Sequence, residues 1–176
     1  MKKMTRIMVI GVGLALAACT SADRFDGPGA GNTVAQNPAF DQTAGIVPGS
    51  VNDPTSVAFF QQSVGDRVLF DVNQHVLSAS GQATLAAQAQ WLAANPDYTA
   101  IIEGHADEQG TRQYNIALGE RRAQSAKAYL VSQGVPAARL KTVSYGKERP
   151  IEVCSDEACY SKNRRAVTVL ATGLTG

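Results

Sequence analysis

The sequence predicts a two-layer α/β (α+β) sandwich, in which helices cover a single sheet. Two observations lead to this fold class. First, strand-like and helix-like patterns alternate over about 110 residues in the order β-α-β-α-β-short helix-β. Second, two helical patterns each stand between two strand patterns, which favours βαβ crossovers. The length of 176 residues, with 44% hydrophobic and 18% charged residues, is typical of one such domain with a tail.

The domain begins with a strand and a helix. Residues 67–72 form an apolar run flanked by polar side chains, which predicts a strand. Ser78 or Ser80 can cap a helix that runs to about Ala94, because Pro96 disfavours its continuation. Residues at i, i+4 and i+7 give this helix an apolar face toward the core: Leu85, Ala89 and Leu92.

The same alternation continues to the end of the chain. Residues 98–103, with the sequence YTAIIE, predict a second strand. A long helix follows over residues 111–133, and Gly134 is suited to its C-terminal cap. Residues 140–145 and 165–170 predict the third and fourth strands.

The first 18 residues are typical of a cleaved secretory signal. Residues 1–6 are basic, and residues 7–18 carry no charge. This apolar run is shorter than the ~20 residues that a transmembrane helix needs. Residues 16–19, Leu-Ala-Ala-Cys, resemble the bacterial lipobox, in which Cys19 would be lipidated; the alternative is an ordinary signal peptide that happens to precede a cysteine. Thr20 in place of Asp favours the outer membrane over the inner one.

Residues 19–58 differ in composition from the domain that follows. They contain four of the seven prolines and several glycines, without a sustained apolar period. Such a segment buries too little surface to offset its ordering entropy. We therefore expect a lipidated Cys19, a flexible tether up to residue 58, and a folded domain over residues 59–176.

Composition excludes several classes of function. A net charge of +1 excludes the strongly basic surface of a nucleic-acid binder. Two His and three Cys leave little material for a metal site, so neither a metal nor a cofactor is expected apart from the lipid. The sequence lacks the G-x-S-x-G and H-E-x-x-H motifs, although Glu103, Asp107 and Glu108 are carboxylates of the kind that a cell-wall enzyme uses.

Four spaced segments carry a family resemblance. They are residues 103–111 (EGHADEQGT), 114–123 (YNIALGERRA), 144–150 (SYGKERP) and 160–165 (YSKNRR). Together they resemble the OmpA-like C-terminal domain family, over about residues 66–172 of this chain. The resemblance implies a mixed sheet of about four strands with two main helices on one face. It departs in one place, since many members have Leu-Ser where this chain has Leu118-Gly119.

The resemblance also implies a ligand: the diaminopimelate residue of the peptidoglycan stem peptide, bound without catalysis. It assigns Asp107 to the ligand's ammonium group and Arg122 to a carboxylate. These residue types suit a zwitterionic group, because such a group needs one fixed anion and one fixed cation, and Arg can donate two parallel hydrogen bonds. The pocket would be completed by Phe70, Asp71, Asn115 and Leu118.

Each of these site residues has a structural alternative. Asp107 can cap its loop or the helix that follows, and Asn115 can fix the same loop. Arg122 can pair on the surface with Glu103 or Glu120. For other polar residues the structural role is preferred: loop stabilisation for His105, and structural pairs or a solvated basic rim for Arg121, Arg164 and Arg165.

The two cysteines that remain after lipidation are Cys154 and Cys159. They lie in one loop with Pro150, and an oxidising compartment favours a disulfide between them. Free thiols and a metal pair are the alternatives. A ring this short is expected to stiffen the loop locally rather than to stabilise the whole domain.

The resulting functional hypothesis is an outer-membrane lipoprotein that holds peptidoglycan non-covalently, with its domain facing the periplasm. The resemblance further implies the Tol envelope system as partner, with TolB competing for an overlapping surface and a role in cell division. The alternatives are a cell-wall-acting enzyme and a protein-only envelope scaffold such as a motor-stator anchor. A stator of that kind carries an N-terminal transmembrane helix, whereas this chain begins with a lipoprotein signal.

Overall fold

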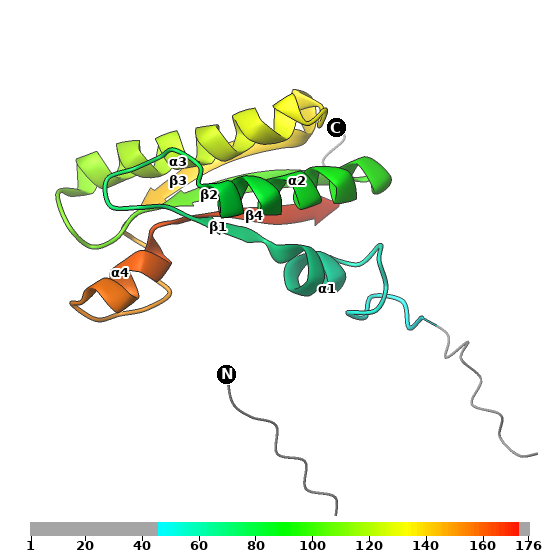
Figure 1. Cartoon of the computed structure of the whole chain (residues 1–176), viewed down its shortest axis with the longest axis horizontal. Coiled ribbons are helices and arrows are strands. Elements are labelled where there is room, and N and C mark those ends of the chain that lie inside the picture. The colour runs from blue at the N-terminus through cyan, green and yellow to red at the C-terminus, as the bar shows by residue number, and fades with distance from the viewer. Residues whose placement is uncertain (1–45, 173–176) are drawn as a thin grey trace, which may run out of the picture. The chain divides into compact units, whose positions relative to one another are not determined.

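Two long helices pack on one face of a four-stranded mixed sheet in the computed structural model, which describes residues 46–172 (Figure 1). The strands lie in the order β1-β4-β2-β3. β2 and β3 run parallel, while β4 runs antiparallel to both of its neighbours. The strands are β1 (Arg67–Leu69), β2 (Tyr98–His105), β3 (Leu140–Gly146) and β4 (Arg165–Thr172). The predicted two-layer sandwich with a mixed sheet is therefore confirmed.

The long helices begin where capping side chains accept backbone N–H groups. Ser78 caps α2 by accepting from the N–H of Gly81, and Thr111 caps α3 by accepting from that of Tyr114. Gly134, at φ +97°, follows α3 in the left-handed conformation that suits a C-terminal cap. The helical segments are α1 (Val57–Phe59), the π-helical turn η1 (Phe60–Gly65), α2 (Ala79–Ala94), α3 (Arg112–Ser132), the 3-10 turn η2 (Ala137–Arg139) and α4 (Glu157–Asn163).

The connections decide where loops meet. The β1–α2–β2 crossover passes over β4, which lies between its two strands, whereas β2–α3–β3 joins neighbouring strands. Because β4 is antiparallel to both β1 and β2, its first residues lie at the same end of the sheet as the last residues of those strands. Three segments far apart in sequence therefore meet at this end.

The first strand is shorter than predicted. The prediction of a strand over residues 67–72 is wrong for its last part, since β1 ends at Leu69. The backbone turns directly afterwards: Gln74 N–H donates to the Asp71 carbonyl at 3.1 Å, and Asn73 takes a φ of +57°. The turn prevents residues 71 and 72 from continuing the ladder of the sheet.

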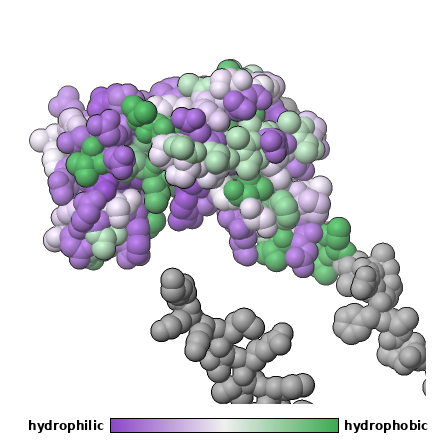
Figure 2. Space-filling model, in the orientation of Figure 1, coloured by the Kyte–Doolittle hydropathy of each residue, from purple (hydrophilic) through white to green (hydrophobic). Residues whose placement is uncertain are grey.

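The core lies between the sheet and the two long helices. Its buried side chains include Phe60, Leu85, Leu92, Ile102 and Leu130. Aromatic rings extend it toward α1, where Trp91 packs between the rings of Phe60 and Tyr98 at centroid distances of 4.9 and 5.1 Å. On the face that Figure 2 shows, exposed hydrophobic side chains are scattered among polar ones rather than gathered in one patch.

The end of the predicted tether contacts the domain. The indole N–H of Trp91 donates to the Pro54 carbonyl at 2.8 Å, and the Tyr98 hydroxyl donates to the Thr55 carbonyl at 3.1 Å. The predicted boundary at residue 59 thus falls inside a region that is bound to α2 and β2. The signal peptide, Cys19 and the tether up to residue 45 lie outside the described residues. Within residues 46–172, no helix has the length and apolar character needed to cross a membrane.

Helix α3 approaches β2 at a contact between two glycines. A Cβ atom added to Gly104 would lie 1.8 Å from the carbonyl oxygen of Gly119, and one added to Gly119 would lie 2.8 Å from the Gly104 oxygen. At the contact between the two glycines both groups are backbone, so no side chain can move aside there, and a Cβ on Gly119 would also lie 2.4 Å from the Ser144 hydroxyl oxygen. The Leu118-Gly119 departure noted in the sequence therefore permits this close packing.

We expect Gly104→Ala to lower the free energy of unfolding by about 3 kcal/mol, because the methyl group forces α3 away from the sheet. Urea unfolding monitored by circular dichroism measures the change. Gly81→Ala in α2 is the matched control, since its Cβ meets no atom closer than 3.4 Å. Alanine's better helix propensity should leave that variant as stable as the parent or up to about 1 kcal/mol more stable. Equal stability of the two variants would contradict the packing argument.

Candidate functional site

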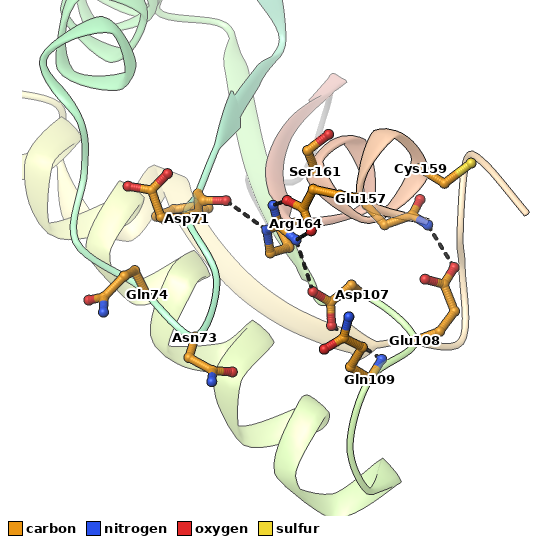
Figure 3. Close-up of polar contacts among 12 residues, drawn as sticks. Asp71, Asn73, Gln74, Asp107, Glu108, Gln109, Glu157, Cys159, Ser161 and Arg164 are labelled. Carbon is orange, nitrogen blue, oxygen red and sulfur yellow. Dashed lines mark hydrogen bonds and ion pairs between the residues drawn. The ribbon is translucent and has the colours of Figure 1, made fainter. Parts of the chain in front are cut away.

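Two of the predicted site residues, Asp71 and Asp107, lie at the end of the sheet where three segments meet (Figure 3). These are the β1–α2 loop (residues 70–78), the β2–α3 loop (residues 106–111) and the junction of α4 with β4 (residues 163–165). Figure 3 shows Arg164 between them, with Asp107 on one side and Glu157 on the other.

Asp107 is a nearly buried carboxylate, only 7% exposed. Its Oδ2 accepts from Arg164 Nη1 at 3.2 Å, and its Oδ1 accepts from the Gln109 N–H at 3.3 Å. Asn115 supports the loop from α3 by donating to the carbonyls of Asp107 at 3.2 Å and Gln109 at 2.7 Å. Both structural roles foreseen for Asp107 and Asn115 are thus present, and they hold the Asp107 carboxylate in one place.

Arg164 ties the three segments together. Its Nε donates to the Phe70 carbonyl at 3.1 Å, Nη1 donates to Asp107, and Glu157 accepts from both Nη1 and Nη2. The side chain is 5% exposed, whereas that of Glu157 is 62% exposed. Of the two structural alternatives for Arg164, the ion pair is correct and the solvated rim is wrong.

Arg122 is completely buried on α3. Its three nitrogens donate to backbone carbonyls: Nε to Gln74 at 2.8 Å, Nη1 to His105 at 2.8 Å and Nη2 to Asp71 at 3.1 Å. The guanidinium also lies 5.2 Å from the centroid of the Phe70 ring. These contacts replace the foreseen surface pair with Glu103 or Glu120, and they close the β1–α2 loop over α3.

Burial and charge act in opposite directions on these groups. Burial lowers the pKa of Arg122 to about 10, and the nearby Asp107 charge opposes this fall. Arg122 therefore remains a cation at neutral pH. The hydrogen bonds that Arg164 donates to Glu157 raise the pKa of Arg164, and the same bonds lower the pKa of Glu157. The site thus contains two fixed guanidinium cations beside two carboxylates.

A cavity of about 320 Å³ opens beside Arg164. Its lining includes the exposed Asp71 and the hydroxyl residues Ser78, Ser80 and Ser161. Phe70 lines the same cavity, although its side chain is only 5% exposed. A carboxylate and a guanidinium, those of Asp71 and Arg164, therefore line one small cavity, as a zwitterionic ligand would require.

Leu118 differs from the other predicted pocket residues. It is 2% exposed and lies on α3 next to Gly119, with its apolar side chain in the interior. Of the predicted pocket residues, only Phe70 and Asp71 line the cavity, while Asp107, Arg122 and Asn115 lie behind its lining residues. Asp107 thus contacts Asn115, and Arg122 contacts Phe70 and the Asp71 carbonyl. Arg164 connects Asp107 to Phe70, whereas Leu118 lies in the packed interior.

The loop with the two cysteines is tied to the same site. Cys154 and Cys159 form the predicted disulfide, so their sulfurs are joined to each other although Asp156 offers a third ligand atom within 4.8 Å. At the far end of α4, Asn163 donates to Glu108 Oε1 at 2.7 Å and to the Glu152 carbonyl at 2.8 Å.

His105 is the last residue of β2 rather than part of the loop. It stacks on the ring of Tyr145 at a centroid distance of 5.6 Å, and it is 1% exposed. Neither ring nitrogen has a hydrogen-bond partner among the described residues, and Glu103 Oε2 is 3.7 Å from Nε2, too far for one. Burial, helped by the charges of Arg165 and Arg149, lowers the pKa of His105 to about 4.

Sequence reasoning missed Glu157 and preferred a structural role for Arg164. Arg164 could have been found from its place in the Asn-Arg-Arg motif before the last strand. Glu157 could not, because no sequence pattern connects it to Asp107, which is 50 residues away. Arg165 has a structural role, since it donates to the carbonyls of Asn163 and Arg149 at 3.3 and 3.1 Å.

Comparison with known proteins gives consistent results. The model of the OmpA family matches residues 69–164. The peptidoglycan-associated lipoprotein of Rhizobium meliloti is 50% identical over 157 residues, covering 89% of this chain and 82% of its own length. That of Mesorhizobium japonicum is 55% identical over 118 residues, covering 67% of this chain and 70% of its own.

Solved structures agree in fold. The crystal structure of the peptidoglycan-associated lipoprotein from Burkholderia pseudomallei is similar with a TM-score of 0.61 and 37% identity, covering 69% of this chain and 98% of that one. The C-terminal domain of Helicobacter pylori MotB has a TM-score of 0.58 at 19% identity, covering 62% and 86%, and so shares the fold.

The buried His105 makes stability depend on pH. Its pKa is lower in the folded state than its ordinary value of 6.5, so the unfolded chain takes up the proton first as pH falls. We expect the free energy of unfolding to fall by up to about 3 kcal/mol between pH 6.5 and pH 4. His105→Phe, which keeps the stacked ring, should remove this part of the dependence of the unfolding free energy on pH. His75→Gln, at the exposed second histidine, should keep it; equal slopes in both variants would contradict the assignment.

Proposed function

Since this chain belongs to the OmpA family and, within it, to the peptidoglycan-associated lipoproteins, we propose that it binds peptidoglycan without cleaving it and tethers the outer membrane to the cell wall. The single observation that carries the proposal is the nearly buried Asp107 carboxylate, held in place beside two buried arginines. The names of the relatives supply the ligand, peptidoglycan.

We propose that the domain recognises the diaminopimelate residue of the peptidoglycan stem peptide. Its side chain ends in an ammonium group and a carboxylate on one carbon. The Asp107 carboxylate, fixed by the Gln109 N–H and by Arg164, suits the ammonium group. Asp71, which is exposed and lines the cavity beside Arg164, offers the ligand's ammonium group a second carboxylate.

The carboxylate is assigned to Arg122. A guanidinium has five N–H donors, and three of those on Arg122 are used by backbone carbonyls. One N–H on each terminal nitrogen remains for a carboxylate. Because the side chain has no exposed surface, the β1–α2 loop must shift before a ligand can reach it.

Lipid on Cys19 supplies the other attachment. Several acyl chains on one residue anchor far more firmly than a single chain does. The tether would then let the domain face the periplasm and reach the cell wall. We further propose that the chain acts in the Tol–Pal system, where TolB and other Tol proteins are its protein partners during cell division.

The alternative of a cell-wall enzyme has less support. A glycosidase needs a carboxylic acid held protonated beside a second carboxylate. The buried candidate, Asp107, is ion-paired with Arg164 instead. The alternative of a protein-only scaffold is distinguished by the binding test below.

Co-sedimentation with purified peptidoglycan sacculi tests the proposal. The protein is the soluble mature chain, residues 19–176 with Cys19→Ser. We expect the parent to pellet, and Asp107→Asn to weaken binding at least about tenfold, because the ligand's ammonium group loses its charged partner. Arg122→Lys should also weaken binding, since one ammonium cannot replace a forked donor.

Asp97→Asn is the matched control. Asp97 is exposed in the turn before β2, at the opposite end of that strand from Asp107. The variant should pellet like the parent, and circular dichroism checks the fold of each protein. Should the parent itself remain in solution, peptidoglycan binding is refuted and a protein partner becomes the better hypothesis.

The anchor is tested in a bacterial host by labelling with radioactive palmitate. We expect the full chain to carry label and to fractionate with the outer membrane, and Cys19→Ser to carry none. Thr20→Ser, next to the lipidated position, should leave the labelling unchanged. Equal labelling of the Cys19→Ser chain would show that the lipid lies elsewhere.

A further inference from the structure

A continuous set of contacts connects the disulfide to Asp107. The bond between Cys154 and Cys159 closes a short ring around the start of α4. Inside this ring Asp156 caps the helix by accepting from the Cys159 N–H at 3.2 Å. The next residue, Glu157, is the first of α4 and reaches across to Arg164. The ring thus encloses the backbone that carries Glu157.

The pairing of Glu157 depends on that backbone. Its side chain is 62% exposed, and exposed ion pairs gain little because ordering two side chains costs entropy. Here the partner, Arg164, is already fixed, since it is 5% exposed and donates to the Phe70 carbonyl. What remains to be ordered is the position of Glu157, and the disulfide and the Asp156 cap restrict it.

Glu157 in turn affects Asp107. Arg164 Nη1 donates both to Asp107 Oδ2 at 3.2 Å and to Glu157 Oε2 at 3.3 Å, so two carboxylates share one guanidinium. When Glu157 leaves, the full charge of Arg164 acts on Asp107 alone. An anion that is neutralised more completely attracts a ligand cation less strongly.

We propose that the Cys154–Cys159 disulfide sets the strength of cation binding at Asp107 by holding Glu157 on Arg164, so that reduction weakens the binding of peptidoglycan. This rests on the proposed function. The reductant is a dithiol: it delivers two electrons and two protons, the Cys154–Cys159 bond breaks into two thiols, and the dithiol becomes a disulfide. Glu157 is a positioning residue in this scheme, because it acts through Arg164 and does not contact the ligand.

The experiment measures the affinity of the soluble mature chain (residues 19–176, Cys19→Ser) for sacculi, oxidised and after treatment with dithiothreitol. We expect reduction to weaken binding about three- to fivefold, the range of one exposed ion pair. Glu157→Gln should be weakened to the same extent and should not respond further to reduction. The double variant Cys154→Ser, Cys159→Ser should match the reduced parent and also ignore the reductant.

Glu152→Gln is the matched control. Glu152 is another carboxylate of the same loop, paired with Lys162 Nζ at 3.0 Å and without contact to Arg164. This variant should bind like the parent and keep its response to reduction. If Glu152→Gln no longer responds to reduction, any negative charge in the loop can produce the effect on binding. If Glu157→Gln still responds fully to reduction, the disulfide acts on binding by another route. Either result overturns the proposal, as does equal binding by the oxidised and reduced parent.

A second measurement separates this inference from the proposed function. Nuclear magnetic resonance of the Arg164 guanidinium reports whether its terminal nitrogens are held. We expect slowed rotation of this group in the oxidised chain and faster rotation after reduction or in Glu157→Gln. If the oxidised parent fails to bind sacculi, the proposed function falls, and this signal still decides whether the disulfide holds Glu157 on Arg164. An unchanged signal on reduction overturns that coupling.

Discussion

The hydrogen bonds of the buried Arg122 guanidinium are the interaction on which the end of the sheet with the candidate site depends. They bring together α3, the end of β2 and the β1–α2 loop through carbonyls that lie 17 to 51 residues away in sequence. Burying a charge is costly unless hydrogen bonds replace its water, and here three carbonyls do so. Burial lowers the pKa to about 10 without removing the charge at neutral pH. The fold therefore places a permanent cation under the loop.

That cation explains the arrangement of the groups around it. Asp107 supplies a nearby negative charge, and Arg164 and Glu157 continue the alternation of cation and anion toward the surface. The order β1-β4-β2-β3 makes this possible, because it brings the ends of β1 and β2 beside the start of β4. The same contacts that close the end of the sheet thus create a mixed-charge site suited to a zwitterion.

The sequence predicted most of the fold because its signals are local. Capping serines and threonines, the helix-ending Gly134, and apolar periodicity depend on neighbours within a few residues, and α2, α3, β2, β3 and β4 follow them closely. The early end of β1 and the π-helical turn η1 were not predicted. The β1–α2 loop turns where Arg122, on another element, takes its carbonyls, and no local pattern contains that contact.

By itself the sequence determined the fold class, the lipobox-like start of the chain and the two motifs that contain Asp107 and Arg122, and it predicted the pairing of Cys154 with Cys159 that the structure shows. Only the tertiary structure decided what these residues touch. It placed Arg122 on backbone carbonyls, paired Asp107 with Arg164, and connected both to Glu157. The physical reason is that ion pairs and buried hydrogen bonds depend on distances across the sheet, which its strand order sets, whereas capping and periodicity depend on neighbours along the chain.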